Sequence, residues 1–121
     1  MSWGQISYFN KSEFLCPCCG KSDMYMPFVK ILDKARRYAN VPFRVTSGFR
    51  CANHNSYCGG SKSSFHLKGR GVDLYCPSSS WRASAVGALL GFSGITIGIY
   101  SAKEHIHVHL NREKGNLCYV K

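Results

Sequence analysis

The chain has 121 residues, of which 45% are hydrophobic, and this length and composition fit one globular domain but not two ordinary ones. It has no apolar run of about eighteen residues to insert into a membrane, and its N-terminus lacks the basic segment and apolar core of a signal peptide, so we expect synthesis in the cytoplasm. The formal net charge of +10 favours an anionic partner such as nucleic acid, phospholipid or an acidic cell-wall polymer, although the scattered basic residues fit a purely solubilising role equally well.

The N-terminal segment, residues 1–26, carries Phe9 and Phe14 but shows no clear periodicity of apolar residues. We predict that this segment is an irregular, cysteine-rich arm lying over a core of residues 27–121. The two together make one domain, 1–121, which we expect to be a monomer.

Seven cysteines are a high count for so short a chain, and their odd number leaves at least one unpaired unless another chain supplies a partner. They are Cys16, Cys18, Cys19, Cys51, Cys58, Cys76 and Cys118. The first three could be half of a second zinc site, which Cys51 and Cys58 would complete with an unusual spacing. Structural thiols or disulfides are the favoured interpretation, because a four-thiolate site usually has two separate C-x-x-C pairs.

Four elements are predicted in the first two thirds of the chain. Apolar residues recur at every third or fourth position over 26–40, after a proline suited to a first helical turn, and this predicts a helix. A short strand is predicted at 43–46, a polar loop at 49–62 and a second strand at 71–75.

The remaining elements complete the predicted sheet. Serines at 78–80 can cap a helix over 81–90, and the segments 95–100 and 105–110 read as an antiparallel hairpin at the centre of the sheet. This order of helices and strands predicts an α+β domain with helices packed on an antiparallel sheet.

The last predicted strand places three histidines on one face. Because alternate side chains of a strand share a face, His105, His107 and His109 point one way and the residues between them point into the core. Three neighbouring imidazoles are costly to bury without partners, and a metal ion resolves that cost. Asp73, on the neighbouring predicted strand and also facing away from the core, can join them.

His66 lies in the loop before the Asp73 strand. Gly69 and Gly71 give this loop the freedom to fold His66 back toward Asp73, and we expect them to leave room for a substrate near the backbone. A surface histidine and a strand-end aspartate are the alternative if each is taken alone. Together with the three later histidines, they supply the ligands of an open catalytic zinc site, in which three side chains leave one position for water.

The residues that carry a family resemblance are Ser47-Gly48-Phe49-Arg50, Asn55, Gly59-Gly60-Ser61, the S-x-H-x-x-G-x-G-x-D pattern from Ser64 to Asp73, and a Gly-Ile-Tyr strand leading to His105-Ile106-His107. This pattern resembles the zinc D-alanyl-D-alanine carboxypeptidase family, which includes phage-type L-alanyl-D-glutamate endopeptidases, vancomycin-resistance dipeptidases and, by fold, the Hedgehog signalling domain. The match runs from about Pro42 to Leu110, and the cysteine segment resembles the N-terminal part of small, often phage-encoded members.

The resemblance implies one zinc ion held by His66, Asp73 and His107. It implies that Arg50 holds substrate carbonyl or carboxylate oxygens, with its fork of donors, and that Ser64 supplies a supporting or substrate-contacting hydroxyl. It also implies that His105 hydrogen-bonds the tetrahedral intermediate.

The resemblance implies that Glu104, three residues before the third ligand, is the general base that activates water and passes the proton to the leaving amine. On a regular strand, however, Glu104 would point away from His107, so this role requires the strand to begin after Glu104. If the strand is already regular there, His105 or His109 must be the base. In several family members an aspartate stands in the place of His109.

We therefore expect a zinc metallopeptidase that cuts peptidoglycan stem peptides, at the D-Ala-D-Ala end or at a link such as L-Ala-D-Glu. Lys68, Arg70 and Lys103 flank the site, which fits an acidic peptide as well as a solvated rim. The setting would be a phage lysis or entry enzyme that acts at the bacterial cell wall after release or as part of a virion. One alternative is an inactive, Hedgehog-like zinc module that binds cell-wall peptide or a protein partner, and a nucleic-acid-binding zinc domain ranks last because no finger or RNA-binding motif is present.

Overall fold

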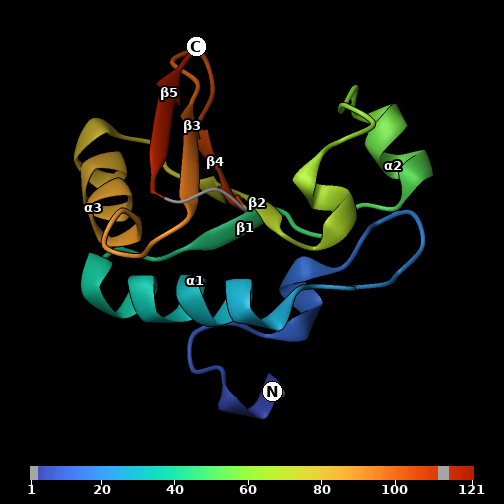
Figure 1. The fold of residues 1–121 in the computed structure, drawn as a ribbon, viewed down its shortest axis with the longest axis horizontal. Coiled ribbons are helices and arrows are strands. Elements are labelled where there is room, and N and C mark those ends of the chain that lie inside the picture. Colours follow the sequence, from blue (N-terminus) through green and yellow to red (C-terminus); the bar gives the residue numbers. More distant parts are fainter. Residues whose placement is uncertain (1–2, 112–114) are drawn as a thin grey trace.

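The strands of the protein form one sheet, and the helices lie around it, as the computed structural model shows for residues 3–111 and 115–121 (Figure 1). The helices are α1 (Met26–Ala39), α2 (Ala52–Tyr57) and α3 (Ser79–Leu89), with short 3-10 helices η1 (Trp3–Gln5), η2 (Lys11–Phe14) and η3 (Phe65–Lys68). The strands are β1 (Arg44–Ser47), β2 (Gly71–Tyr75), β3 (Ile95–Ile99), β4 (His105–Leu110) and β5 (Leu117–Val120). Residues 1–2 of the predicted arm and 112–114 of the predicted core lie outside the described residues.

The sheet has the strand order β1-β2-β4-β3-β5, and β1 with β2, β2 with β4 and β4 with β3 pair antiparallel. The predicted α+β class and the central β3–β4 hairpin are confirmed. The prediction of a purely antiparallel sheet is wrong in one detail, because β5 pairs parallel with β3 and makes the sheet mixed. This strand has four residues, mostly exposed, and therefore lacks the buried alternation that marked the other strands.

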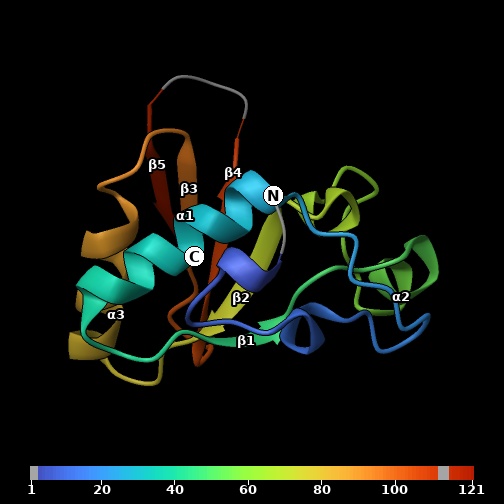
Figure 2. The ribbon, with the colours of Figure 1, turned by 90° about the horizontal axis from the view of Figure 1, so that it is seen from below.

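The core lies between one face of the sheet and the helices α1 and α3, which also pack on one another (Figures 1 and 2). Val72 and Leu74 of β2 and Ile106 and Val108 of β4 are fully buried against this layer, as the alternation predicted. The opposite faces of β2 and β4 are therefore left for polar side chains.

Both long predicted helices are present, with ends shifted by a residue or two. Helix α1 has a proline in its first turn and ends where Asn40 adopts a left-handed conformation, with φ 59°. Helix α3 begins where the Ser78 hydroxyl accepts a hydrogen bond from the Trp81 N–H, 3.2 Å away.

Two segments differ from the prediction. The predicted loop 49–62 contains helix α2, which the polar sequence Ala52–Tyr57 does not mark by apolar periodicity. The N-terminal arm contains η1 and η2, and Phe9 and Phe14 are buried members of the core. The arm is held by Asp33 of α1, whose carboxylate accepts hydrogen bonds from two backbone N–H groups of residues 7–8.

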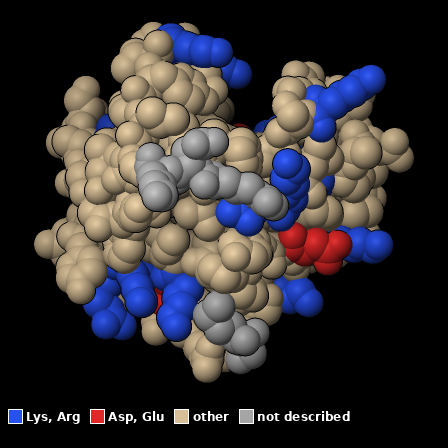
Figure 3. Space-filling model, viewed as in Figure 1, with Lys and Arg blue, Asp and Glu red and all other residues tan. Residues whose placement is uncertain are grey.

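The surface of the described part of the chain carries its basic residues in several places. On the face seen in Figure 3, Lys and Arg side chains lie in separate groups over different elements. In residues 3–111 and 115–121, no helix combines the length and apolar character needed to pass through a bilayer.

Candidate metal centre

The register of β2 against β4 brings Asp73 directly opposite His107. Both side chains project from the face of the sheet that turns away from α1 and α3, because their strand neighbours Val72, Leu74, Ile106 and Val108 fill the core. His107 Nδ1 lies 3.1 Å from Asp73 Oδ1. The strand pairing thus sets the distance between an imidazole and a carboxylate.

His66 reaches the same carboxylate from η3 and is almost fully buried. Its Nδ1 lies 2.8 Å from the carbonyl oxygen of Gly48, which can only accept, so Nδ1 carries the proton. The unprotonated Nε2 then faces Asp73 Oδ1 at 3.4 Å. Ser64 fixes this turn, since its hydroxyl accepts a hydrogen bond from the His66 N–H. A carbonyl that orients the far nitrogen of a histidine is the usual support of a metal ligand.

The backbone conformation and the close packing at Gly69, directly after η3, require a glycine. Gly69 has φ 67°, and a Cβ there would lie 2.0 Å from the carbonyl oxygen of Asp23. A Cβ on Gly71 would press on the backbone of residues 65–66. The expectation that these glycines leave room for a substrate is therefore wrong, because the space is filled by neighbouring parts of the chain.

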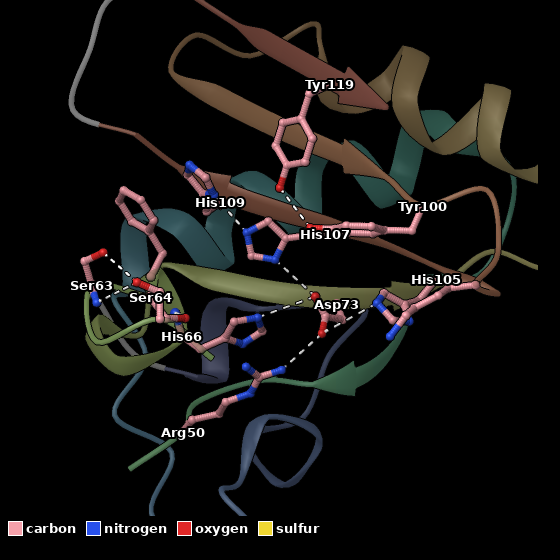
Figure 4. Close-up of a pocket in the computed structure, with 13 residues that line it drawn as sticks. Arg50, Ser63, Ser64, His66, Asp73, Tyr100, His105, His107, His109 and Tyr119 are labelled. Atoms are coloured by element: carbon pink, nitrogen blue, oxygen red, sulfur yellow. Dashed lines mark hydrogen bonds and ion pairs between the residues drawn. The ribbon is translucent and has the colours of Figure 1, made fainter. Parts of the chain in front are cut away.

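His66, Asp73 and His107 offer three ligand atoms that all lie within 4.8 Å of one another (Figure 4). Burial disfavours the charged carboxylate, but the His107 and His66 imidazoles beside it outweigh burial and hold the pKa of Asp73 well below its usual range. Two imidazole nitrogens and one carboxylate oxygen fit a zinc ion that keeps a coordination position open, and they converge at the floor of a cavity. These residues thus fit the metal that the sequence pattern predicts.

His109 lies behind His107 and not among the converging atoms. Its Nδ1 is 2.8 Å from His107 Nε2, and its ring stacks on Phe65 with 3.9 Å between ring centroids and 6° between planes. Burial and then the charges of His107 and His66 lower the pKa of His109 to about 4. His109 is therefore neutral at pH 7 and can accept the Nε2 proton of His107, which leaves His107 Nδ1 free to bind a metal.

Arg50 lies beside the cluster and is fixed by three groups. Its guanidinium donates to Asp73 Oδ2 at 3.3 Å, to the Ser47 hydroxyl at 3.0 Å and to Asn55 Oδ1 at 3.4 Å. Asn55 is buried and donates its amide to the carbonyl oxygen of Ser61, 2.8 Å away. This network holds the guanidinium at the edge of the cavity.

The cavity above the cluster has a volume of about 490 Å³. Its lining joins the cluster to hydroxyl, aromatic and basic side chains: Arg50, Ser61, Ser63, Ser64, Phe65, His66, Asp73, Tyr100, Lys103, His105, His107, His109 and Tyr119. His105 faces the cluster, with Nε2 3.9 Å from Asp73 Oδ2 (Figure 4). Burial, aided by the nearby positive charge of Lys103 and opposed by Asp73, lowers the pKa of His105.

The structure does not bring Glu104 into this cavity. The carbonyl oxygen of Glu104 accepts a hydrogen bond from the Cys76 N–H at 2.7 Å, just before β4 begins at His105. The strand thus begins after Glu104, which is the condition for its carboxylate to face the ligands. In this conformation, however, Glu104 lines a separate hollow together with Ser79 and Arg82, and it is not among the residues that line the cavity.

Two tyrosines at the cavity were missed by the sequence analysis. The Tyr100 and Tyr119 hydroxyls lie 3.1 Å apart over the cluster. Tyr119 comes from β5, which was not predicted, and no apolar periodicity within Leu117–Val120 could have placed it. Burial and then the hydrogen bond to Tyr100 raise the pKa of Tyr119, so its hydroxyl stays protonated and can donate at neutral pH.

Comparison with known proteins gives one positive result. The model of a family described as Peptidase M15 matches residues 7–109, which include every residue of the cluster and most of the chain. A search of curated proteins gives no match.

Proposed function

The chain belongs to the Peptidase M15 family, whose members are zinc-dependent peptidases, and on that premise we propose that it hydrolyses a peptide bond in the stem peptides of peptidoglycan. The observation that carries the proposal is the convergence of His66, Asp73 and His107 at the floor of an open cavity. When bound there, zinc supplies Lewis-acid activation of water and of the scissile carbonyl.

The side chains around the cluster suit a peptide with free carboxylates. Arg50 presents guanidinium N–H groups at the cavity edge, and Lys103 adds a second positive charge to its lining. Stem peptides carry carboxylates at their C-terminus and on D-glutamate, so either scissile bond, D-Ala-D-Ala or L-Ala-D-Glu, has an anionic group nearby. Bidentate contacts from arginine would orient such a group.

Proton transfer is assigned in our proposal to His105. It is half-buried, faces the cluster and has a lowered pKa, so it is neutral at pH 7 and able to accept a proton. Glu104, the base implied by the family resemblance, would need the turn before β4 to rearrange before it reached the cavity. The Tyr119 hydroxyl is placed to donate to a developing oxyanion.

The family resemblance supports a small phage-type enzyme, used in lysis or entry and acting on the wall after release or within a virion. We expect it to work as a monomer, with peptidoglycan peptide as its partner and with no binding of nucleic acid. The separate groups of basic residues in Figure 3 support this expectation more than they would support a nucleic-acid groove.

Purified protein incubated with muropeptides tests the proposal. Mass spectrometry should show either loss of terminal D-alanine or release of the stem peptide at L-alanine, and a chelator should abolish the product until zinc is restored. His107→Ala should be inactive, while His54→Ala, at a histidine outside the cavity, should be active. Absence of any chelator-sensitive product from every muropeptide would contradict the proposal.

A second candidate is a zinc module that binds peptide without cutting it, and the position of Glu104 outside the cavity favours it. Such a module would bind the same muropeptides in a zinc-dependent manner and release no product. Replacement of His105 by glutamine separates the two, because it should slow an enzyme strongly and leave the affinity of a binding module almost unchanged.

A further inference from the structure

A second group of metal-binding side chains lies outside the cavity, where the Cys16–Gly20 turn meets the start of α2. Cys16, Cys19 and Cys51 offer sulfur atoms that all lie within 4.8 Å of one another. Cys16 Sγ and Cys51 Sγ are 3.7 Å apart although the residues are 35 positions apart in the chain. All seven cysteines are free in the structure.

The turn is built to stabilise thiolates. Its chain reverses through a hydrogen bond from the Gly20 N–H to the Cys16 carbonyl oxygen, 2.8 Å, and through Gly20 itself at φ 74°. The Cys51 N–H points at Cys16 Sγ at 3.4 Å, and the His54 N–H, in the first turn of α2, points at Cys51 Sγ at 3.5 Å. Backbone N–H groups directed at sulfur favour the anionic form, which is the form that binds metal.

The charge state of Cys16 agrees with this geometry. Burial alone would raise its pKa, but the N–H groups of Cys51, Cys19 and Cys18 more than compensate and lower the pKa of Cys16 to about 7.

We propose that Cys16, Cys19 and Cys51 bind a structural zinc ion, distinct from the ion of the catalytic cluster. Four sulfurs around zinc at 2.3 Å are about 3.8 Å from each other, which is close to the Cys16–Cys51 separation, whereas a disulfide requires about 2.05 Å. Cys16 and Cys19 form the C-x-x-C pair that such sites use, and Cys51 is the distant thiol. The fourth position is open to water or to the exposed Cys18 thiol of the same turn.

Cys58, the other residue that could have completed the set, instead contacts the His54 ring at 3.4 Å. The spacing of these cysteines along the sequence is unusual for a metal site, but the fold brings them together, because the N-terminal arm runs beside the segment that enters α2.

The proposed ion would link the N-terminal arm to the segment that contains Gly48 and Arg50, which both contact residues of the catalytic cluster. Cys51 directly follows Arg50, and the Phe49 N–H donates to the Phe14 carbonyl oxygen at 3.0 Å. Gly48, whose carbonyl orients His66, packs so closely on the Phe14 backbone that a Cβ there would lie 2.7 Å from the Phe14 Cα. A metal at the cysteines thus fixes the segment from which His66 and Arg50 are positioned.

Cobalt substitution tests the site without any assay of hydrolysis. Reduced, metal-free protein titrated with cobalt should develop an intense sulfur-to-cobalt charge-transfer band, which ligation by His66, Asp73 and His107 cannot produce. The band should persist in His107→Ala, which removes a ligand of the catalytic cluster, and in Cys118→Ser, the control. It should be lost in Cys51→Ser and in Cys19→Ser, and Cys51→Ser should hold one zinc fewer per chain than the wild type.

Absence of the charge-transfer band in the wild-type protein would overturn the proposal, and this measurement needs no variant to fold. A band retained in a folded Cys51→Ser protein would overturn it as well. So would a disulfide that includes Cys16, Cys19 or Cys51, mapped by mass spectrometry of peptides from protein purified without reductant. None of these results bears on hydrolysis of muropeptides, so the two proposals can fail independently.

Discussion

His107 and His109 form a donor–acceptor pair, with His107 Nε2 2.8 Å from His109 Nδ1 on the same face of β4. A strand brings residues two apart to the same side, and here one histidine becomes the support of the other. The same relationship exists on the far side of the cluster, where the Gly48 carbonyl holds His66. Each imidazole ligand is thereby fixed through the nitrogen that does not face Asp73.

Replacement of His109 by alanine should weaken zinc binding at the catalytic cluster by roughly 10- to 100-fold, because His107 loses the acceptor that fixes its ring. His109→Asp should retain most of the affinity, since a carboxylate also accepts the Nε2 proton. The measurement is the free zinc concentration that restores half of the hydrolytic activity to metal-free protein. His54→Ala is the matched control, and equal values for His109→Ala and wild type would exclude the supporting role.

Some features of the site follow from the local sequence, and others depend on tertiary contacts. The alternation of β4 predicted that His105, His107 and His109 share a face, and the strand pairing confirms it. No local pattern could tell which of these three imidazoles joins His66 and Asp73, because that depends on the register of β2 against β4 and on where η3 places His66. The position of His109 behind His107 depends further on Phe65, which packs on its ring from η3.

Glu104 and Tyr119 show where sequence reasoning fails in opposite directions. The motif pointed to Glu104, but the conformation of the chain just before β4 places this residue at a separate hollow. Tyr119 had no motif, and it reaches the cavity only because β5 joins the sheet in parallel next to β3. Neither the end of a strand nor an edge pairing is specified by local periodicity.

The proton-transfer assignment predicts opposite outcomes for two adjacent residues. His105→Gln should lower kcat on muropeptides by about 10²- to 10⁴-fold, the range expected for loss of a general acid–base group. Glu104→Gln should change kcat by no more than about threefold, since its side chain lies in a different hollow. A strong loss in Glu104→Gln with an active His105→Gln would show that the turn rearranges when substrate binds and that the carboxylate is the base.

Arg50→Lys should lower kcat/KM for muropeptides by roughly 10- to 100-fold, because lysine keeps the charge but loses the fork of N–H donors, and such charged hydrogen bonds are worth about 1.5–3 kcal/mol. Arg44→Lys is the control, since Arg44 is exposed on β1 with its guanidinium 5.8 Å from the Tyr75 ring centroid. The zinc requirement should be the same in both variants. An Arg50→Lys enzyme with normal kcat/KM would show that Arg50 only buttresses Asp73.

Gly98→Ala should displace Tyr119 from the cavity. A Cβ on Gly98, in the strand between β4 and β5, would lie 2.4 Å from the Tyr119 hydroxyl oxygen and 2.5 Å from the ring carbon that carries it. The tyrosine must move or the strands must separate, which should cost about 1–3 kcal/mol of unfolding free energy and lower the melting temperature. Activity on muropeptides should fall at the same time, because the hydroxyl that can donate to an oxyanion leaves its place.

A double-mutant cycle separates the two effects, since the clash requires both partners. Tyr119→Ala removes the ring, so adding Gly98→Ala to it should cost little further stability. The double variant should therefore lose less stability than the sum of the losses of the two single variants. Tyr119→Phe keeps the ring and loses only the contact between the Tyr100 and Tyr119 hydroxyls, so it should keep the wild-type melting temperature within a few degrees and still lose activity. Thermal unfolding and kcat are measured on the wild type and these four variants. Additive stability losses would show that Gly98→Ala does not act through a clash with Tyr119, and a fully active Tyr119→Phe would mean that the Tyr119 hydroxyl does not serve the site in the way its position over His107 indicates.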